Sequence, residues 1–222
     1  MMSKVKLILS IACVFGYATI DASANDWVEL FDGRTLNGWE EIGSEDSFRV
    51  QGGTIVGGNE PGDKTTFLCT RKHYVDFELR FAVKLIDTGL NSGVQLRAVR
   101  RTLSSGKPGP IVGPQVEING KNPSKSFSGL IYGQGYKGYL TRDKTRKSDQ
   151  HYKSTEWNEF RVVVRGKEIK TWLNGIAIAT TVLSDEMHSM HSTGAIGLQV
   201  HGIREDKEPG EVAFKDIRIK EL

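Results

Sequence analysis

The chain has 222 residues, 38% hydrophobic and 26% charged, with a formal net charge of +3 at pH 7. This length is enough for one domain with a sizeable hydrophobic core. The near balance of 30 basic and 27 acidic residues argues against a polyanionic partner such as nucleic acid.

The first 24 residues have the pattern of a secretory signal peptide. Lys4 and Lys6 precede an apolar run, and Ala22-Ser23-Ala24 supplies a small-x-small cleavage pattern. The run is short for a membrane span and no later segment approaches one, so we expect no membrane-spanning segment. The mature chain, residues 25–222, is expected to be a single domain that is secreted or periplasmic.

The two cysteines do not predict an internal disulfide. Cys13 lies in the signal, and a lipid anchor there is disfavoured because Ser10 stands where the lipoprotein pattern has Leu. Cys69 then remains alone in the mature chain. We expect it to be a small buried side chain rather than a nucleophile.

The rest of the pattern is all-β. Short alternating runs, separated by Gly, Asn, Asp or Pro, predict strands that together form a sandwich or barrel. The expected strands are 27–31, 47–50, 54–56, 67–70, 76–85, 93–99, 115–118, 129–132, 159–164, 169–173, 195–200 and 211–219. One helical turn is expected at 185–188, and long loops at 101–113 and 137–156, the second of which is long enough to line or cover a site.

Four strand-like segments have an unusual second face. Side chains alternate across a strand, so Val94 and Leu96 are expected in the core while Gln95 and Arg97 point the other way. Surface strands usually carry Lys, Glu and Thr on their outer face. These strands instead carry Arg, Gln, Glu, Trp, Asn and His, which are the residue types common in sugar-binding sites. We predict a single polar cleft on one sheet, formed by Gln95, Arg97, Gln115, Glu117, Trp172, Gln199 and His201.

Other residues are open to more than one interpretation. Asn174-Gly175 is first a hairpin turn and second a hydrogen-bonding site. Tyr132 either donates its hydroxyl to a ligand or is a buried, satisfied tyrosine. Trp172 is either a stacking platform or packs against a sheet edge.

No cofactor is predicted, and a calcium site stays open although the residue spacing does not support one. Calcium would take oxygen ligands from loops, but the loop aspartates have no recognisable spacing; they are Asp32, Asp46, Asp63, Asp143 and Asp149. His188 and His191 have no flanking carboxylates, so they are not expected to hold a metal. The basic run 142–147 has no interleaved aromatic residues and is expected to be a solvated loop.

Several motifs together resemble the 3-keto-disaccharide hydrolase family, across nearly the whole mature chain. These motifs are Leu30–Trp39, Asn91–Val94 with Arg97, Gly113–Ile118, Gly129–Gly133, Glu156–Asn158, Trp172–Gly175, Ile196–Gly202 and Phe214–Leu222. The resemblance implies a concanavalin-like jelly-roll β-sandwich of two antiparallel sheets, a sugar-binding face and export by bacteria that degrade polysaccharides. Relatives often have Glu after the Ile-Tyr-Gly step, where this chain has Gln134.

The chemistry expected of such a site differs from ordinary glycoside hydrolysis, which uses two carboxylates. Glu117 is the only acid in the predicted cleft. A ketone at C3 of a sugar acidifies the proton on C2, so one base, an enolate-stabilising donor and an acid for the leaving group suffice. By residue type these roles fit Glu117, Arg97 and His201, with substrate contacts expected from Gln95, Gln115, Tyr132, Gln134, Trp172, Asn174 and Gln199.

Two alternatives remain open. Glu117 and Arg97 could form a structural ion pair across neighbouring strands. The whole domain could also be a non-catalytic carbohydrate-binding module on the same fold. In either case the expected partner is a carbohydrate, and the sequence does not indicate the oligomeric state.

Overall fold

The computed structural model describes residues 26–120, 127–136, 138–142 and 150–222. The predicted signal peptide and most of the basic run 142–147 lie outside these residues. Within the described part of the chain, no helix is long and apolar enough to cross a membrane.

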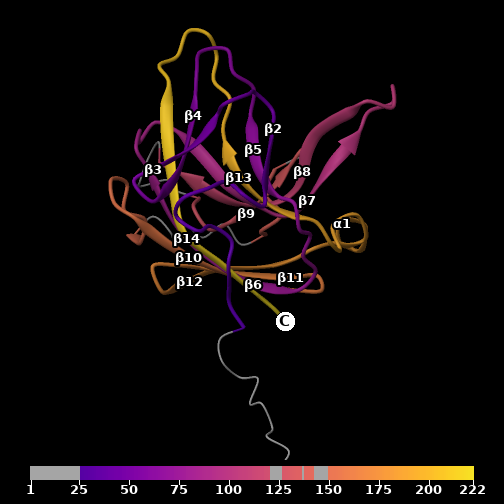
Figure 1. The fold of residues 1–222 in the computed structure, drawn as a ribbon. Helices are drawn as coiled ribbons and strands as arrows, with labels where there is room; N and C mark the ends of the chain where they lie inside the picture. The colour runs from indigo at the N-terminus through magenta and orange to yellow at the C-terminus, as the bar shows by residue number, and fades with distance from the viewer. Residues whose placement is uncertain (1–25, 121–126, 137, 143–149) are drawn as a thin grey trace, which may run out of the picture.

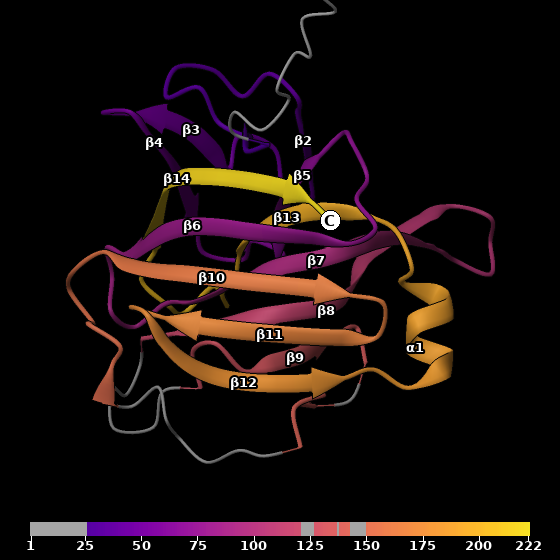
Figure 2. The same ribbon diagram turned by 90° about the horizontal axis from the view of Figure 1, so that it is seen from below.

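Two antiparallel sheets stack as a sandwich, which confirms the predicted all-β jelly roll (Figure 1). The larger, eight-stranded sheet has the order β12-β11-β10-β6-β14-β4-β3, with β1 also paired to β14. Its strands are β1 (Val28–Glu29), β3 (Phe48–Gln51), β4 (Thr54–Asn59), β6 (Phe77–Leu85), β10 (Asn158–Arg165), β11 (Glu168–Leu173), β12 (Ile176–Val182) and β14 (Gly210–Glu221). Figure 2 looks onto this sheet, with the smaller one behind it.

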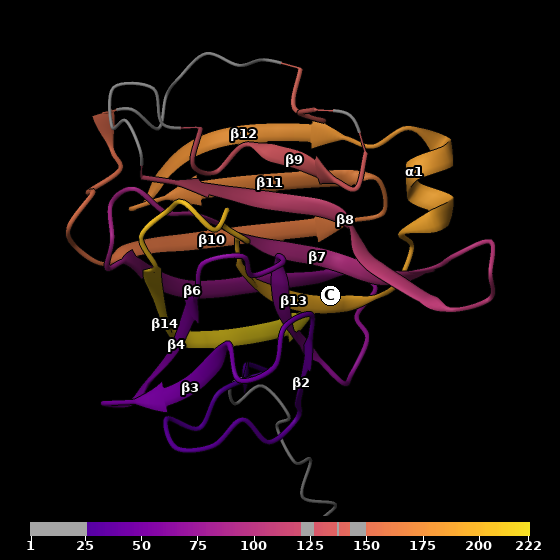
Figure 3. The same cartoon turned by 90° about the horizontal axis from the view of Figure 1, so that it is seen from above.

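The smaller, six-stranded sheet has the order β2-β5-β13-β7-β8-β9 and lies nearer the viewer in Figure 3. Its strands are β2 (Trp39–Ile42), β5 (Thr66–Thr70), β7 (Asn91–Thr102), β8 (Pro108–Asn119), β9 (Ile131–Gln134) and β13 (Ala195–Val200). The short helix α1 (Asp185–Met190) begins at Ser184, whose side chain accepts a hydrogen bond from the Met187 N–H.

The hydrophobic core lies between the two sheets and consists of the apolar side chains that point inward from each strand. Leu79 and Phe81 of β6 face Val94 and Leu96 of β7 across it, and all four are at most 2% exposed. Phe81 also stacks on Phe160, with ring centroids 5.1 Å apart. Cys69 is buried, as expected, in a smaller cluster on the other face of the six-stranded sheet.

The prediction of a loop at 101–113 is wrong for most of this range. The strands β7 and β8 continue to Thr102 and from Pro108, and form a long hairpin that projects from the same end of the sandwich as α1 (Figures 2 and 3). Gly and Pro in this segment had suggested a loop, but cross-strand pairing such as Arg100 with Ile111 holds it extended. The strands β2 and β12 were also missed, since the first carries two glutamates and the second lacks polar alternation.

Candidate functional site

The outer face of the six-stranded sheet carries a row of polar side chains, and the register of the strands explains why. Gln95 pairs with Gln115, and Gln115 pairs with Tyr132 on β9. Directly paired residues point to the same face of a sheet. Two residues along the strands, Gly93 pairs with Glu117, so Glu117 lies on the same face beside this row.

These side chains form one hydrogen-bonded cluster. Gln95 Nε2 donates to Gln115 Oε1 at 2.7 Å. Gln115 Nε2 in turn lies 3.3 Å from Glu117 Oε2 and 3.4 Å from Gln199 Oε1. The predicted grouping of Gln95, Gln115, Glu117 and Gln199 on one face is therefore confirmed.

A glycine makes room for this cluster. A Cβ atom on Gly93 would lie 2.4 Å from the side-chain carbonyl carbon of Gln115, which real contacts do not allow. Because Gly93 stands between Gln199 and Glu117, the amides can lie flat over the backbone of the sheet and reach each other.

Glu117 is the electrostatic centre of the site. Glu117 is only 5% exposed. Burial raises the pKa of its carboxyl group to about 7, although hydrogen bonds from Asn91 and Gln115 act to lower it. The hydrogen bond from Asn91 Nδ2 to Glu117 Oε1 is 2.7 Å long. A carboxyl group with this pKa accepts or releases a proton near neutral pH.

Aromatic rings stand at one side of Glu117. Tyr139 lies between Phe127 and Tyr132, with ring centroids 5.3 Å from each. Burial raises the pKa of Tyr139, and the charge of Glu117 raises it further, so its hydroxyl keeps its proton. The sequence did not single out Tyr139 or Asn91: Tyr139 lies in a predicted loop, and Asn91 appeared only as a motif residue.

A pocket of about 510 Å³ shares one residue, Asn91, with the cluster. Asn91 and His201 line it together with residues 202–204 and 207–210. His201 is exposed, and its Nδ1 donates a hydrogen bond to the carbonyl of Gly202. The structure thus places His201 in a pocket that it shares with Asn91, and outside the hydrogen-bonded cluster.

Arg97 does not join the site, and the prediction that it lines the cleft is wrong. The pairing of β7 is irregular between Gln95 and Val99, and Arg97 has a positive φ of 50°. This irregularity turns its side chain toward the eight-stranded sheet, where it forms an ion pair with Asp76 at 2.7 Å. The suggested ion pair between Arg97 and Glu117 is therefore also absent.

The Arg97 guanidinium instead ties several segments together. It donates to the carbonyls of Val75, Gly166 and His191. The side chain is 2% exposed, and burial lowers its pKa although Asp76 opposes this. Arg97 is a structural residue at the end of the sandwich that carries α1.

Trp172 and Asn174 also lie elsewhere, because β11 belongs to the eight-stranded sheet. Trp172 is on its outer face, under the guanidinium of Arg161 at 4.3 Å. The prediction that Trp172 shares a cleft with Glu117 is wrong, since periodicity shows which side of a strand a residue takes but not which sheet the strand joins.

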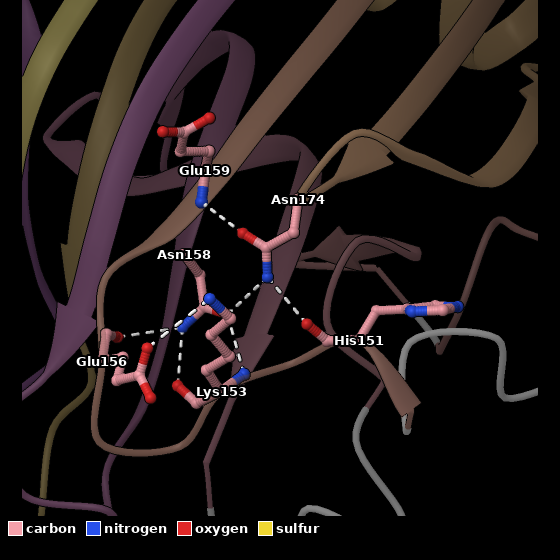
Figure 4. A network of polar contacts seen from close by, with 6 residues as sticks. All are labelled: His151, Lys153, Glu156, Asn158, Glu159 and Asn174. Atoms are coloured by element: carbon pink, nitrogen blue, oxygen red, sulfur yellow. Dashed lines mark hydrogen bonds and ion pairs between the residues drawn. The ribbon is translucent and has the colours of Figure 1, made fainter.

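Asn174 lies in a hairpin turn, which was the first of the two interpretations of Asn174-Gly175. Its φ of 49° fits the turn between β11 and β12, and its amide accepts from Glu159 N–H and donates to the His151 carbonyl and to Asn158 Oδ1 (Figure 4). The Asn158 amide continues the network to the backbone of Lys153. A sugar-binding role for Asn174 in the Glu117 site is ruled out by its place on the other sheet.

Gln134 lies on the same face as Tyr132, at the far end of β9 from Glu117. It pairs with Gly113. No group of three or more potential metal-ligating side chains occurs among the residues that the structure describes.

Comparisons with known proteins agree with this fold. The model of the 3-keto-alpha-glucoside-1,2-lyase-like domain family matches residues 26–220. A putative glycosyl hydrolase from Parabacteroides distasonis has a TM-score of 0.57 at 22% identity, over 88% of this chain and 94% of that one. The comparison with curated protein sequences gave no match.

Two further solved structures share the sandwich. The carbohydrate-binding module CBM66 from Bacillus subtilis has a TM-score of 0.51 at 14% identity, over 82% of this chain and 94% of the module. A laminarinase from Flavobacterium has a TM-score of 0.54 at 12% identity, over 87% and 98%. At these identities the likeness concerns the fold alone, and the fold serves both enzymes and binding modules.

Proposed function

Because the chain belongs to the 3-keto-alpha-glucoside-1,2-lyase-like domain family, we propose that it is an exported enzyme that cleaves 3-keto-glycosides or 3-keto-disaccharides. The observation that carries this proposal is Glu117, a buried carboxyl group with a pKa of about 7. Amides and aromatic rings surround it, as a sugar site requires, and no second acid stands in the described cluster.

The proposed reaction begins at C2 of the keto sugar. Glu117 takes the C2 proton, and the electron pair of the C–H bond forms an enolate with the C3 carbonyl. The enolate then expels the glycosidic oxygen from C1, which leaves a double bond between C1 and C2 and a leaving group that takes up one proton. Water adds across this double bond in a later step, so the net result is hydrolysis.

The enolate needs a donor, and Arg97 cannot supply it from its place near Asp76. We assign this role to the hydroxyl of Tyr139, whose raised pKa keeps it protonated. The rings of Tyr132 and Tyr139 meet at an interplanar angle of 75°, so Tyr132 packs beside the proposed donor. His201 at the rim of the pocket is the proposed acid for the leaving oxygen.

The glutamine row is assigned to substrate hydroxyls. Gln95 Oε1 is buried and has no hydrogen-bond partner among the described residues, so it is an acceptor that a sugar hydroxyl would satisfy. Gln115 fixes the orientation of Gln95 by accepting its hydrogen bond, and Gln115 itself donates to Gln199.

A non-catalytic carbohydrate-binding module is the second candidate, favoured by the shared fold with CBM66. Amides and aromatic rings serve both functions, whereas a carboxyl group tuned to neutral pH serves only proton transfer. The two functions therefore differ in what they require of Glu117.

One experiment decides between them. The purified protein is incubated with a 3-keto-disaccharide and, separately, with its unoxidised parent, and released monosaccharide is measured. Release from the keto sugar alone supports the enzyme. Binding of either sugar with no release from any 3-keto-glycoside contradicts it. Cell fractionation of the native host tests export, which intact Met1 on the purified native protein would disprove.

A further inference from the structure

A second surface lies on the opposite side of the sandwich from Glu117. The outer face of the eight-stranded sheet, which Figure 2 views directly, contains a groove of about 500 Å³. We call it the outer groove. Its lining includes Arg80, Ala82, Arg161, Trp172, Asp216 and Arg218.

The groove results from an irregularity between β6 and β14. Their pairing shifts between Lys215 and Arg218, and Asp216 has a positive φ of 52°. A bulge of this kind interrupts the ladder locally. Two small residues, Ala82 on β6 and Gly175 in the turn between β11 and β12, line the groove and keep its floor low.

Trp172 is held rigidly at the edge of the outer groove. Glu78 accepts two hydrogen bonds from Arg161, at 2.7 and 3.0 Å, and Arg161 lies over the indole ring. On its other side Trp172 borders a pocket of about 280 Å³ lined by Lys170, Ala177 and Ala179. Trp172 therefore lines both hollows, is partly exposed, and has its orientation fixed by Arg161 before any ligand binds.

The charges of the outer groove balance. Three arginines line it, Arg80, Arg161 and Arg218, and so do three acids, Glu29, Glu159 and Asp216. Because the lining has no net charge, it does not attract a polyanion, while a ligand with many hydroxyls finds both donors and acceptors beside an aromatic ring.

From this combination we propose that the outer groove is a second carbohydrate-binding site, which takes a neutral oligosaccharide by stacking a sugar ring against Trp172. It is separate from the Glu117 site and does not depend on the reaction proposed there. Its role is to hold the protein on a polysaccharide while the other face is free.

The test measures binding of maltohexaose, cellohexaose and xylohexaose by calorimetry, with polygalacturonate as the anionic comparison. Trp172→Ala is expected to weaken binding of at least one neutral probe about tenfold or more. Arg218→Ala, which removes a wall of the groove but no core contact, is expected to weaken the same probe to a smaller extent. Both variants are checked for folding by circular dichroism.

Matched controls locate the site. Trp157 also lies under a cation, Lys215 at 4.7 Å, but does not line the groove, so Trp157→Ala is expected to keep full affinity. The proposal is overturned if no neutral probe binds, if only polygalacturonate binds, or if Trp172→Ala keeps the affinity of the parent protein for every neutral probe. None of these outcomes depends on whether the protein cleaves a 3-keto sugar.

Discussion

Asn91 Nδ2 lies 2.7 Å from Oε1 of Glu117 and donates a hydrogen bond to it, so a neutral amide on the neighbouring strand holds this buried carboxyl group. A cation at this place would lower the pKa of Glu117, as Arg161 lowers that of Glu78. The Asn91 amide lowers the pKa of Glu117 by less than burial raises it, so the net shift is upward. The site therefore contains a base poised near neutral pH.

Replacing Glu117 by Gln tests the proton transfer directly. The amide keeps the size and much of the hydrogen bonding of the carboxylate but cannot accept a proton. We expect turnover of a 3-keto-disaccharide to fall by about 10²-fold or more with little change in substrate affinity. Single-turnover kinetics and calorimetry measure the two quantities.

The control is Glu40→Gln, since Glu40 lies on the same face but on the exposed edge strand β2. It should be fully active. Full activity of Glu117→Gln would contradict the assigned base and make His201 the next candidate.

The pH dependence of turnover follows from the pKa of about 7 at Glu117. Only the ionised carboxylate accepts the C2 proton, so kcat/KM is expected to rise as pH increases through about 7 on the acid side of the profile. Below this value the rate should fall about tenfold for each pH unit. A rate that stays constant between pH 5 and 8 would argue against Glu117 as the base.

Arg97→Met is expected to destabilise the fold rather than impair the chemistry. The substitution leaves the carbonyls of Val75 and Gly166 without their donor and Asp76 without its cation. Removing one partner of such a pair costs about 3 to 5 kcal/mol of unfolding free energy. Urea denaturation measures the loss.

Arg204→Met is the matched control, because the side chain of Arg204 is 74% exposed and its ion pair with Asp206 lies in solvent. Its unfolding free energy should be nearly unchanged. If folded Arg97→Met turns over substrate 10²-fold more slowly at low temperature, the structural assignment of Arg97 is wrong.

Tyr139→Phe removes the proposed enolate donor and keeps the ring between Phe127 and Tyr132. We expect kcat to fall about 10²-fold while KM changes little, because the lost hydrogen bond acts on the developing charge. Tyr152→Phe serves as the comparison, since the Tyr152 hydroxyl is buried without a partner in the described structure. Equal activity of the two variants would remove Tyr139 from the mechanism.

The sequence alone determined the fold class, because alternation of apolar residues in many short strands is a local property that tertiary structure rarely reverses. It also determined the side of the strand on which Gln95, Gln115, Glu117 and Gln199 lie. These four residues come from strands that the chain pairs side by side, so their predicted grouping is confirmed.

The tertiary structure alone decided the rest of the site. Trp172 has the alternation expected of a cleft residue, but its strand pairs into the other sheet, and no local pattern encodes that choice. Arg97 is displaced by one irregular pairing, which reverses the direction of its side chain. Tyr139 reaches Glu117 from a loop, where residue spacing carries no signal, and the raised pKa of Glu117 exists only because folding removes its carboxyl group from water.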